Sequence, residues 1–237
     1  MNTPIPRRTL LTGGLLLGAS TWMGTAACSA PDSPPSTLET ITAEPTMSPA
    51  PTGAGTAPVG AGTAPRTLLA YFSRTGENYY YGGRRDLEVG NTEVLARMIS
   101  ELIDCDVHRI VAADPYPAGY DATVARNVRE QDADARPKIA NSLASIGQYD
   151  VVLLGSPIWN VRAPMIMSTF TDSHDFTGKT VHPFVTYAVS GLGSIERDYA
   201  TACPKARIGA GLAVRGEEVP QHRRDVETWL REARLPA

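Results

Sequence analysis

The sequence predicts an α/β domain, a three-layer sandwich in which five parallel strands in the order 2-1-3-4-5 carry helices on both faces. Five apolar segments occur between residues 67 and 214, with helical segments between them. The apolar segments are continuous, which is typical of parallel strands buried on both faces. Loops rich in Gly, Ser, Thr and Asn follow the first, third and fourth segments. Because these strands are neighbours in that order, the three loops are expected to meet at one edge of the sheet.

The first 28 residues have the features of an export signal. Arg7 and Arg8 precede an apolar run at 10–23, and small residues precede Cys28. This pattern is typical of a cleaved signal whose cysteine carries lipid, and paired arginines address a route for proteins exported already folded. A spanning helix needs roughly 20 apolar residues, so the run is short for one. A retained amphipathic leader is the alternative, and Thr25, where lipoprotein signals carry Leu, leaves an unlipidated secreted form open.

Residues 29–65 are expected to form a flexible tether. They are rich in Pro, Thr, Ala, Gly and Ser, and Gly-Ala-Gly-Thr-Ala-Pro occurs at both 53–58 and 60–65. Such a composition buries too little apolar area to offset chain entropy. The remaining stretch, 66–237, has the size of one domain. After loss of residues 1–28 the chain keeps 20 basic and 25 acidic residues, which is not the charge balance of a nucleic-acid-binding protein.

The first strand, predicted at 67–73, ends in a loop suited to a phosphate. Ser73, Arg74, Thr75 and Gly76 follow the apolar run, and hydroxyls with free N–H groups before a helix favour an anion. There is neither a glycine-rich dinucleotide fingerprint nor a Walker motif in the loop. The phosphate is therefore expected to belong to another kind of ligand. The alternatives are that Ser73 and Thr75 only cap a helix, and that Arg74 is solvated.

An insertion at 77–90 separates this loop from the first helix, predicted at 91–102. Asn91 or Thr92 is the expected cap, which returns both residues to the phosphate loop. The tyrosines at 79–81 are expected to pack within the insertion or to contact a partner. The later elements are strands at 106–111, 149–155, 181–187 and 206–214, and helices at 121–134, from Pro164, up to Ala202, and around Val226, Trp229, Leu230 and Ala233.

Two aromatic residues lie at the ends of the third and fourth strands. Trp159 follows the third strand and Tyr187 ends the fourth. Rings facing each other across a slot would stack a flat heterocycle. A phosphate at one end and aromatic rings at the other fit flavin mononucleotide (FMN), although both rings could also be ordinary rim or core aromatics.

The domain resembles the flavodoxin superfamily, specifically exported flavodoxin-like proteins whose phosphate loop is split by an insertion. The resemblance covers 66–235 and rests on Tyr71–Tyr79, Asp86–Glu93, Asp114–Pro117, Tyr120–Val124, Gln131–Ala133, Ala135–Pro137, Asp175–Thr180 and Ser190–Gly193. It implies that the FMN phosphate is held by Ser73, Arg74, Thr75, Asn91 and Thr92, with Asn78 a further candidate. It also implies that the isoalloxazine ring is lined by Pro157, Ile158, Trp159 and Asn160 on one side and by Tyr187, Ser190, Gly191 and Gly193 on the other.

The resemblance implies a redox protein that carries electrons or reduces quinone-like acceptors, with donor and acceptor unidentified. The leader adds the expectation that the protein is held at the outer face of the cytoplasmic membrane through lipidated Cys28. A rival hypothesis is a binding module that has lost FMN. It rests on four departures from the family pattern, because β-branched residues tolerate positive φ poorly: Asn160, Val161, Ala188 and Val189.

Other chemistries have less support in the sequence. Ser156 and Ser190 are not in a nucleophile elbow, so the sequence gives no catalytic constellation for a hydrolase. No metal site is expected, because the histidines have no ligand spacing: His108, His174, His182 and His222. Cys105 and Cys203 leave a disulfide, two buried thiols or an accidental surplus open.

Overall fold

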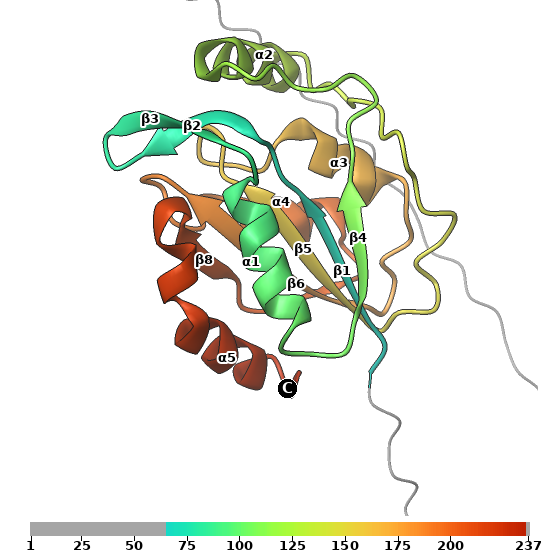
Figure 1. Ribbon diagram of the computed structural model, residues 1–237. Coiled ribbons are helices and arrows are strands. Elements are labelled where there is room, and N and C mark those ends of the chain that lie inside the picture. The colour runs from blue at the N-terminus through green and yellow to red at the C-terminus, as the bar shows by residue number, and fades with distance from the viewer. Residues whose placement is uncertain (1–64, 236–237) are drawn as a thin grey trace, which may run out of the picture. The chain divides into compact units, whose positions relative to one another are not determined.

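The computed structural model describes residues 65–235 (Figure 1). The expected leader, Cys28 and all but the last residue of the expected tether lie outside this range, as do residues 236–237. Within the described part of the chain, no helix combines the length and the apolar character needed to cross a bilayer.

A parallel sheet forms the centre of the domain, as predicted. Its strands lie in the order β4-β1-β5-β6-β7, and β8 also pairs with β6. If β7 and β8 are counted as two parts of one strand, this is the predicted order 2-1-3-4-5. The strands are β1 (Thr67–Phe72), β4 (Asp106–Ile110), β5 (Val151–Pro157), β6 (Thr180–Tyr187), β7 (Arg207–Ile208) and β8 (Leu212–Arg215).

The fifth strand, expected to be continuous at 206–214, is broken between β7 and β8. Gly209 lies against the ring of His182, and a Cβ there would come within 2.2 Å of the ring's Cε1. The carbonyl of Ala210 accepts a hydrogen bond from Trp229 Nε1 at 2.9 Å. At the break the backbone therefore contacts side chains of β6 and the last helix, which the local sequence does not reveal.

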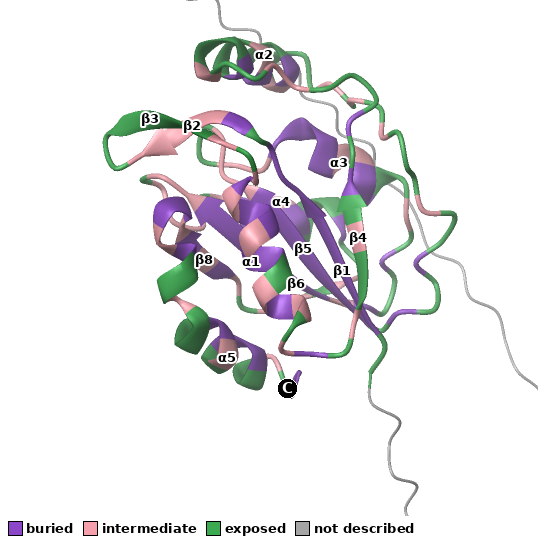
Figure 2. Ribbon diagram, viewed as in Figure 1, coloured by how far each residue is buried: buried purple, intermediate pink, exposed green. Residues whose placement is uncertain are grey.

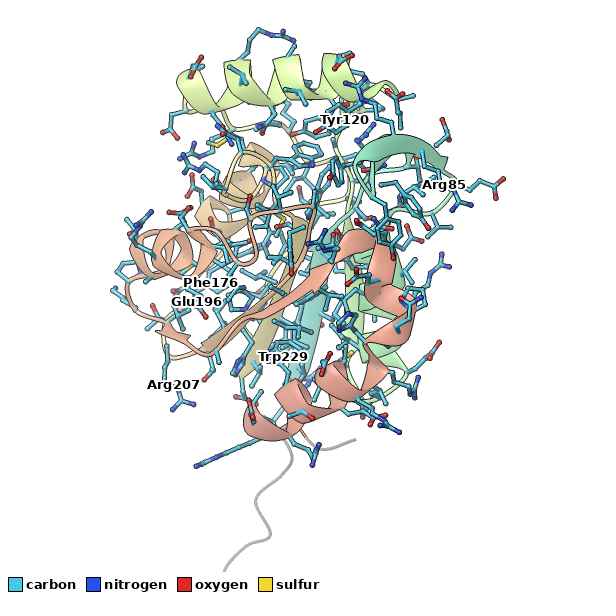
Figure 3. The ribbon with its side chains drawn as sticks, turned by 90° about the vertical axis from the view of Figure 1, so that its left-hand side faces the viewer. Arg85, Tyr120, Phe176, Glu196, Arg207 and Trp229 are labelled. Atoms are coloured by element: carbon cyan, nitrogen blue, oxygen red, sulfur yellow. The ribbon has the colours of Figure 1, made fainter. Side chains whose placement is uncertain are left out.

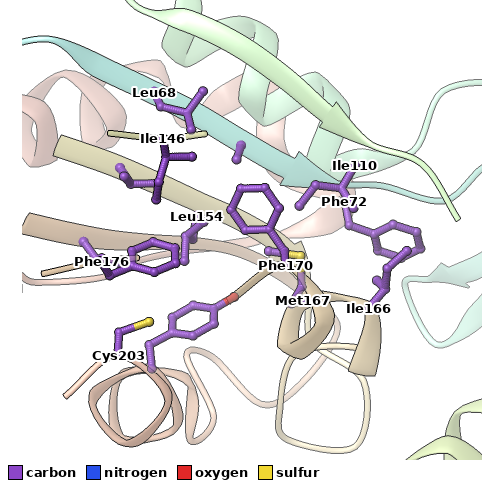
Figure 4. Packing of buried hydrophobic residues seen from close by; sticks show 14 of the residues in the cluster. Leu68, Phe72, Ile110, Ile146, Leu154, Ile166, Met167, Phe170, Phe176 and Cys203 are labelled. Atoms are coloured by element: carbon purple, nitrogen blue, oxygen red, sulfur yellow. The ribbon is translucent and has the colours of Figure 1, made fainter. Parts of the chain in front are cut away.

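Helices cover both faces of the sheet. One face packs against α1 (Asn91–Ser100) and α5 (Arg223–Glu232), whose buried residues include Leu95, Ile99, Trp229 and Leu230. The other face packs against α3 (Met165–Asp172) and α4 (Ile195–Ala202), with Phe170 and Phe176 in its core (Figure 4). Residues of the irregular segment before β5, such as Ile146 and Tyr149, complete this second core.

The helix α2 (Tyr120–Asp132) does not cover either face. It lies beyond the carboxyl ends of the strands, above α3 and beside the hairpin in Figure 1. Its buried residues are all polar: Thr123, Asn127 and Glu130. Figure 2 shows that most of its surface is exposed or half-buried, which agrees with the polar surface helix predicted at 121–134.

The insertion after β1 is a β-hairpin, β2 (Gly76–Tyr80) and β3 (Gly83–Leu87). Two turn residues connect the strands, Tyr81 at φ 43° and Gly82 at φ 85°. Positive φ at both positions is the conformation of the two-residue hairpin turns that match strand twist. The sequence predicts the insertion but not its strands, because their residues are mostly charged or polar.

Both cysteines of the domain are free thiols. Cys105 packs against the cluster beneath α1 and α5, whereas Cys203 belongs to the cluster beneath α3 and α4 (Figure 4). They therefore lie on opposite faces of the sheet, and of the alternatives left open a disulfide between them is excluded.

Candidate functional site

A cavity of about 100 Å³ lies at the carboxyl edge of the sheet, between the ends of β1, β5, β6 and β8. All three loops that were expected to converge contribute to it, together with the hairpin and the start of α2. Of the predicted site residues, it is lined by Ser73, Arg74, Asn78, Asn91, Thr92, Pro157, Ile158, Trp159 and Tyr187.

The amino end of α1 forms one wall of the cavity. The residue preceding the helix is Gly90, and no side chain of α1 caps it, so the expected cap by Asn91 or Thr92 is wrong. Instead, Ser73 Oγ accepts a hydrogen bond from the N–H of Glu93 at 3.1 Å. Thr92 is also fixed, because its Oγ1 is 2.7 Å from Thr186 Oγ1 on β6. The first turn of α1 is thus tied to two strand ends. The N–H groups of Glu93 and Val94 donate to the Gly90 carbonyl, which leaves those of Asn91 and Thr92 without an intrahelical partner.

Arg74 is buried beside this helix end, with 8% of its surface exposed, so the alternative of a solvated side chain is wrong. Its Nη1 donates to the carbonyls of Pro117 at 2.8 Å and Ala118 at 2.9 Å, and its Nη2 donates to the carbonyl of Glu77. Its buried Nε has no partner among the described residues. Burial lowers the pKa of the guanidinium below its usual value, and Glu77 is the main group that opposes this shift. Arg74 therefore keeps one donor that the protein does not use.

Aromatic side chains form the opposite part of the cavity. Trp159 packs edge-on against Tyr116 at 5.1 Å and Phe72 at 5.8 Å between ring centroids. Tyr187 has the guanidinium of Arg215 at 6.0 Å from its ring. Both predicted rings thus line one cavity. The groups that contact them, the rings of Phe72 and Tyr116 and the guanidinium of Arg215, do not line this cavity.

The turn after Trp159 has strained backbone. Asn160 has φ 51° and Val161 has φ 61°. The N–H of Trp159 donates to the carbonyl of Arg162 at 2.9 Å across the turn, and the carbonyl of Val161 accepts from the N–H of Ser194 at 2.8 Å. Gly193 packs so closely that a Cβ there would come within 2.1 Å of this carbonyl. The suspected conflict between a β-branched residue and positive φ is present at Val161, whereas Ala188 and Val189 do not have positive φ.

Five predicted site residues do not line the cavity. Thr75 is exposed and lines a separate cavity of about 150 Å³ beside β4. The others belong to the two turns joined through the Val161 carbonyl: Asn160, Ser190, Gly191 and Gly193.

Six residues of the lining were not predicted: Tyr79, Tyr120, Thr186, Ala188, Gly216 and Glu217. Tyr120 begins α2, and Arg84 of the hairpin lies 4.5 Å from its ring centroid; Figure 3 shows Tyr120 beside the hairpin that carries Arg85. Tyr79 had been assigned to packing or a partner. The polar residues around Glu217 would predict an exposed acidic side chain. Only its position just after the fifth strand indicates that it lies at the carboxyl edge of the sheet.

Known proteins resemble this domain in sequence and structure. A crystal structure of a proposed flavoprotein from Bacteroides uniformis is 31% identical, with a TM-score of 0.58, and the match covers 71% of this chain and 99% of that one. A second proposed flavoprotein, from Bacteroides eggerthii, is 28% identical with a TM-score of 0.58, covering 70% of this chain and 96% of that one. Comparison with curated proteins gives no significant match. A family model described as flavodoxin matches residues 87–233, more than half of the chain. The chain therefore belongs to the flavodoxin family.

Proposed function

We propose that this protein is a flavoprotein that binds FMN at the cavity described above. The observation that carries the proposal is the meeting of the first turn of α1, Ser73 and the buried guanidinium-bearing Arg74 in the lining of one cavity. A helix start and a cationic N–H donor favour an anion. The similar Bacteroides structures are described as proposed flavoproteins, which supports a flavin as the ligand.

The size and lining of the cavity fit part of FMN. Its volume of about 100 Å³ is below the roughly 300 Å³ at which small-molecule pockets begin. It therefore suits the phosphate and ribityl chain, while the isoalloxazine ring occupies the open side near Trp159 and Tyr187. In this arrangement the protein supplies binding, orientation and electrostatics.

Bound FMN would supply one- and two-electron transfer. Within the proposal, the residues of the cavity hold the phosphate and keep one edge of the ring accessible, as transfer to a carrier or to quinone-like acceptors requires. The donor and acceptor are not specified by any residue of the cavity.

Binding is tested by comparing FMN with riboflavin, which lacks the phosphate, by quenching of flavin fluorescence. The full chain is expected to bind FMN at least about tenfold more tightly, because the phosphate gains charge-assisted hydrogen bonds. Ser73→Ala should reduce the preference for FMN over riboflavin. The variant removes a hydroxyl from the cavity and loosens the first turn of α1, because it deletes the acceptor of the Glu93 N–H. Ser100→Ala is the matched control, because Ser100 makes one hydrogen bond at the other end of the same helix.

The proposal would be contradicted if the purified chain showed no flavin absorption bands and did not quench the fluorescence of added FMN. The binding module without flavin would then be favoured, and the strain at Val161 is the feature that supports it.

We further propose that the protein is exported and held to the membrane through Cys28. The support is the sequence pattern of paired arginines, apolar run and cysteine. Replacing Arg7 and Arg8 with Lys is expected to leave the protein in the cytoplasm, as judged by cell fractionation. Export of this variant at the normal rate would refute the twin-arginine route.

A further inference from the structure

Two buried threonine hydroxyls meet in the wall of the cavity, and only Thr92 was predicted as a site residue. Thr92, in the first turn of α1, is 2% exposed, and Thr186, near the end of β6, is 5% exposed. Both residues line the cavity, and their Oγ1 atoms are 2.7 Å apart, a usual length for an O–H···O hydrogen bond. A helix and a strand far apart in the sequence are thus joined here by this threonine pair.

The hydrogen bonds of the threonine pair leave one donor without a partner. Each hydroxyl has a single proton to donate, so the pair has two protons and its internal hydrogen bond uses one of them. Among the described residues, neither Oγ1 makes any other hydrogen bond. A buried hydroxyl proton without an acceptor is costly, because the group has lost its hydrogen bonds to water. An acceptor oxygen on a ligand in the cavity would satisfy the second proton.

The position of Thr92 indicates which of the two hydroxyls faces the ligand. Its N–H and that of Asn91 have no intrahelical partner, so Thr92 lies among free donors at a helix start, where an anion is favoured. Thr186 instead lies within the sheet, in register with Pro157 of β5 on one side and Val214 of β8 on the other. Thr186 is therefore suited to donate to Thr92, and Thr92 to donate onward.

We propose that Thr186 is a positioning residue, whose hydroxyl donates to Thr92 Oγ1 and so directs the Thr92 proton toward the phosphate of a bound flavin. A hydroxyl that accepts a hydrogen bond is polarised into a stronger donor, so this arrangement favours flavins that carry the phosphate. The inference rests on the proposed binding of FMN. The rival roles of Thr186 are a direct hydrogen bond to the ligand and a purely structural link between α1 and β6.

The experiment measures dissociation constants of FMN and of riboflavin for the full chain by quenching of flavin fluorescence. Thr186→Val removes the hydroxyl and keeps the branched shape of the side chain, whereas Thr186→Ser keeps the hydroxyl. Thr92→Val removes the other hydroxyl, and the double variant completes a double-mutant cycle. Thr180→Val is the matched control, because Thr180 lies at the opposite end of β6 and does not line the cavity.

Thr186→Val is expected to weaken FMN binding about tenfold and to leave riboflavin binding unchanged, because a hydrogen bond to a charged phosphate is stronger than a neutral one. Thr186→Ser should recover most of the lost affinity. Thr92→Val should lose at least as much FMN affinity as Thr186→Val, and the double variant should lose no more than Thr92→Val alone. Thr180→Val should leave both affinities unchanged.

Thermal unfolding of each variant checks that the fold is retained, and Thr186→Ala replaces Thr186→Val if the valine variant unfolds. Equal weakening of FMN and riboflavin by Thr186→Val would overturn the inference, because the threonine pair would then only support the shape of the cavity. Unchanged affinities would show that Thr92 needs no partner to orient it.

The double variant and the serine variant exclude the remaining rival. Losses that add in the double variant would overturn the inference, because Thr186 would then contact the ligand directly. Failure of Thr186→Ser to recover affinity would show that the hydroxyl is not the group that matters. If the unmodified chain binds neither flavin, or shows no preference for FMN, the proposed function itself fails, and the inference fails with it.

Discussion

Val161 is the residue whose backbone conflicts most with its side chain. Its φ of 61° lies in a region where a β-branched residue is strained, and the side chain is exposed, so packing does not explain the conformation. The turn is instead fixed by the hydrogen bond from the N–H of Trp159 to the carbonyl of Arg162 and by the one from the N–H of Ser194 to the carbonyl of Val161. The strain therefore sits in the loop that carries the cavity's tryptophan.

Replacing Val161 with Gly is expected to raise the free energy of unfolding by about 1 kcal/mol. The relief of a left-handed valine, roughly 1–3 kcal/mol, exceeds the extra chain entropy of glycine, roughly 0.5–1 kcal/mol. Urea unfolding measures the change. Val189→Gly is the control, because Val189 is also exposed but lacks positive φ, and it should destabilise. Equal losses in both variants would show that Val161 is unstrained.

The residue-level prediction of the site depended on the ends of the strands. Ser73, Trp159 and Tyr187 were found because each ends or follows an apolar segment. Glu217 was missed because nothing in a run of Gly, Glu, Glu and Val marks burial. The partners of Arg74 were missed because the carbonyls of Pro117 and Ala118 lie far away in the sequence.

At the scale of helices and strands, the elements with continuous apolar runs were predicted from the sequence, and those without such runs were not. The strands β1, β5 and β6 were predicted within a few residues, since their apolar runs are buried on both faces. The hairpin β2–β3 was not predicted, because its strands lack an alternating pattern of apolar residues. Its pairing depends on the turn at Tyr81 and Gly82. The break in the fifth strand depends on His182, a tertiary contact.

The helix α2 is attached differently from the other helices. It contributes no residue to either apolar cluster, and polar contacts hold it, such as Tyr120 N–H to Glu77 Oε2 at 2.9 Å and Gln131 Nε2 to the Trp159 carbonyl at 3.2 Å. Net stabilisation from such hydrogen bonds is small compared with burial of large apolar side chains.

Hydrogen exchange is therefore expected to be faster in α2 than in α1 or α5. Regions with few buried apolar contacts open at lower free energy than the core. Mass spectrometry of peptides covering 120–132, 91–100 and 223–232 gives the comparison. Protection of α2 equal to that of α1 would mean that its polar contacts hold it as firmly as a packed core.

At the scale of the whole molecule, three histidines make stability depend on pH. Burial lowers the pKa of His108, His174 and His182 below the usual value. Below about pH 6.5 the unfolded chain therefore binds more protons than the folded chain. The contribution of these histidines to the free energy of unfolding is fully present above that pH and is lost as the pH drops toward their pKa values in the folded state. The carboxyl groups with lowered pKa act only at lower pH, below their usual value of 3.8: Asp121, Asp134 and Asp175.

The free energy of unfolding is expected to be lower at pH 5.5 than at pH 7.5. His182→Gln should reduce this difference, because the buried ring hydrogen-bonded to the Ala210 carbonyl no longer gains a proton on unfolding. Urea unfolding at both pH values tests it. His222→Gln is the control, because the half-buried ring of His222 faces the carboxylates of Glu218 and Asp225 instead of an apolar core; this variant should not reduce the difference found in the unmodified chain. A stability that is flat across this range would contradict the burial of neutral histidines.

Every strand of the sheet runs toward the cavity, so the chain must enter the domain from the other end. Pro65, Arg66 and Leu235 line one cavity there, which brings both ends of the described chain together on the side away from the site. Figure 1 shows β1 beginning beside the C-terminal end of α5. A cell surface, an affinity tag or an electrode could be joined to either end. In each case the attachment point would lie at the end of the domain opposite the mouth of the cavity. Attachment through either end of the described chain thus leaves the cavity accessible to molecules in solution.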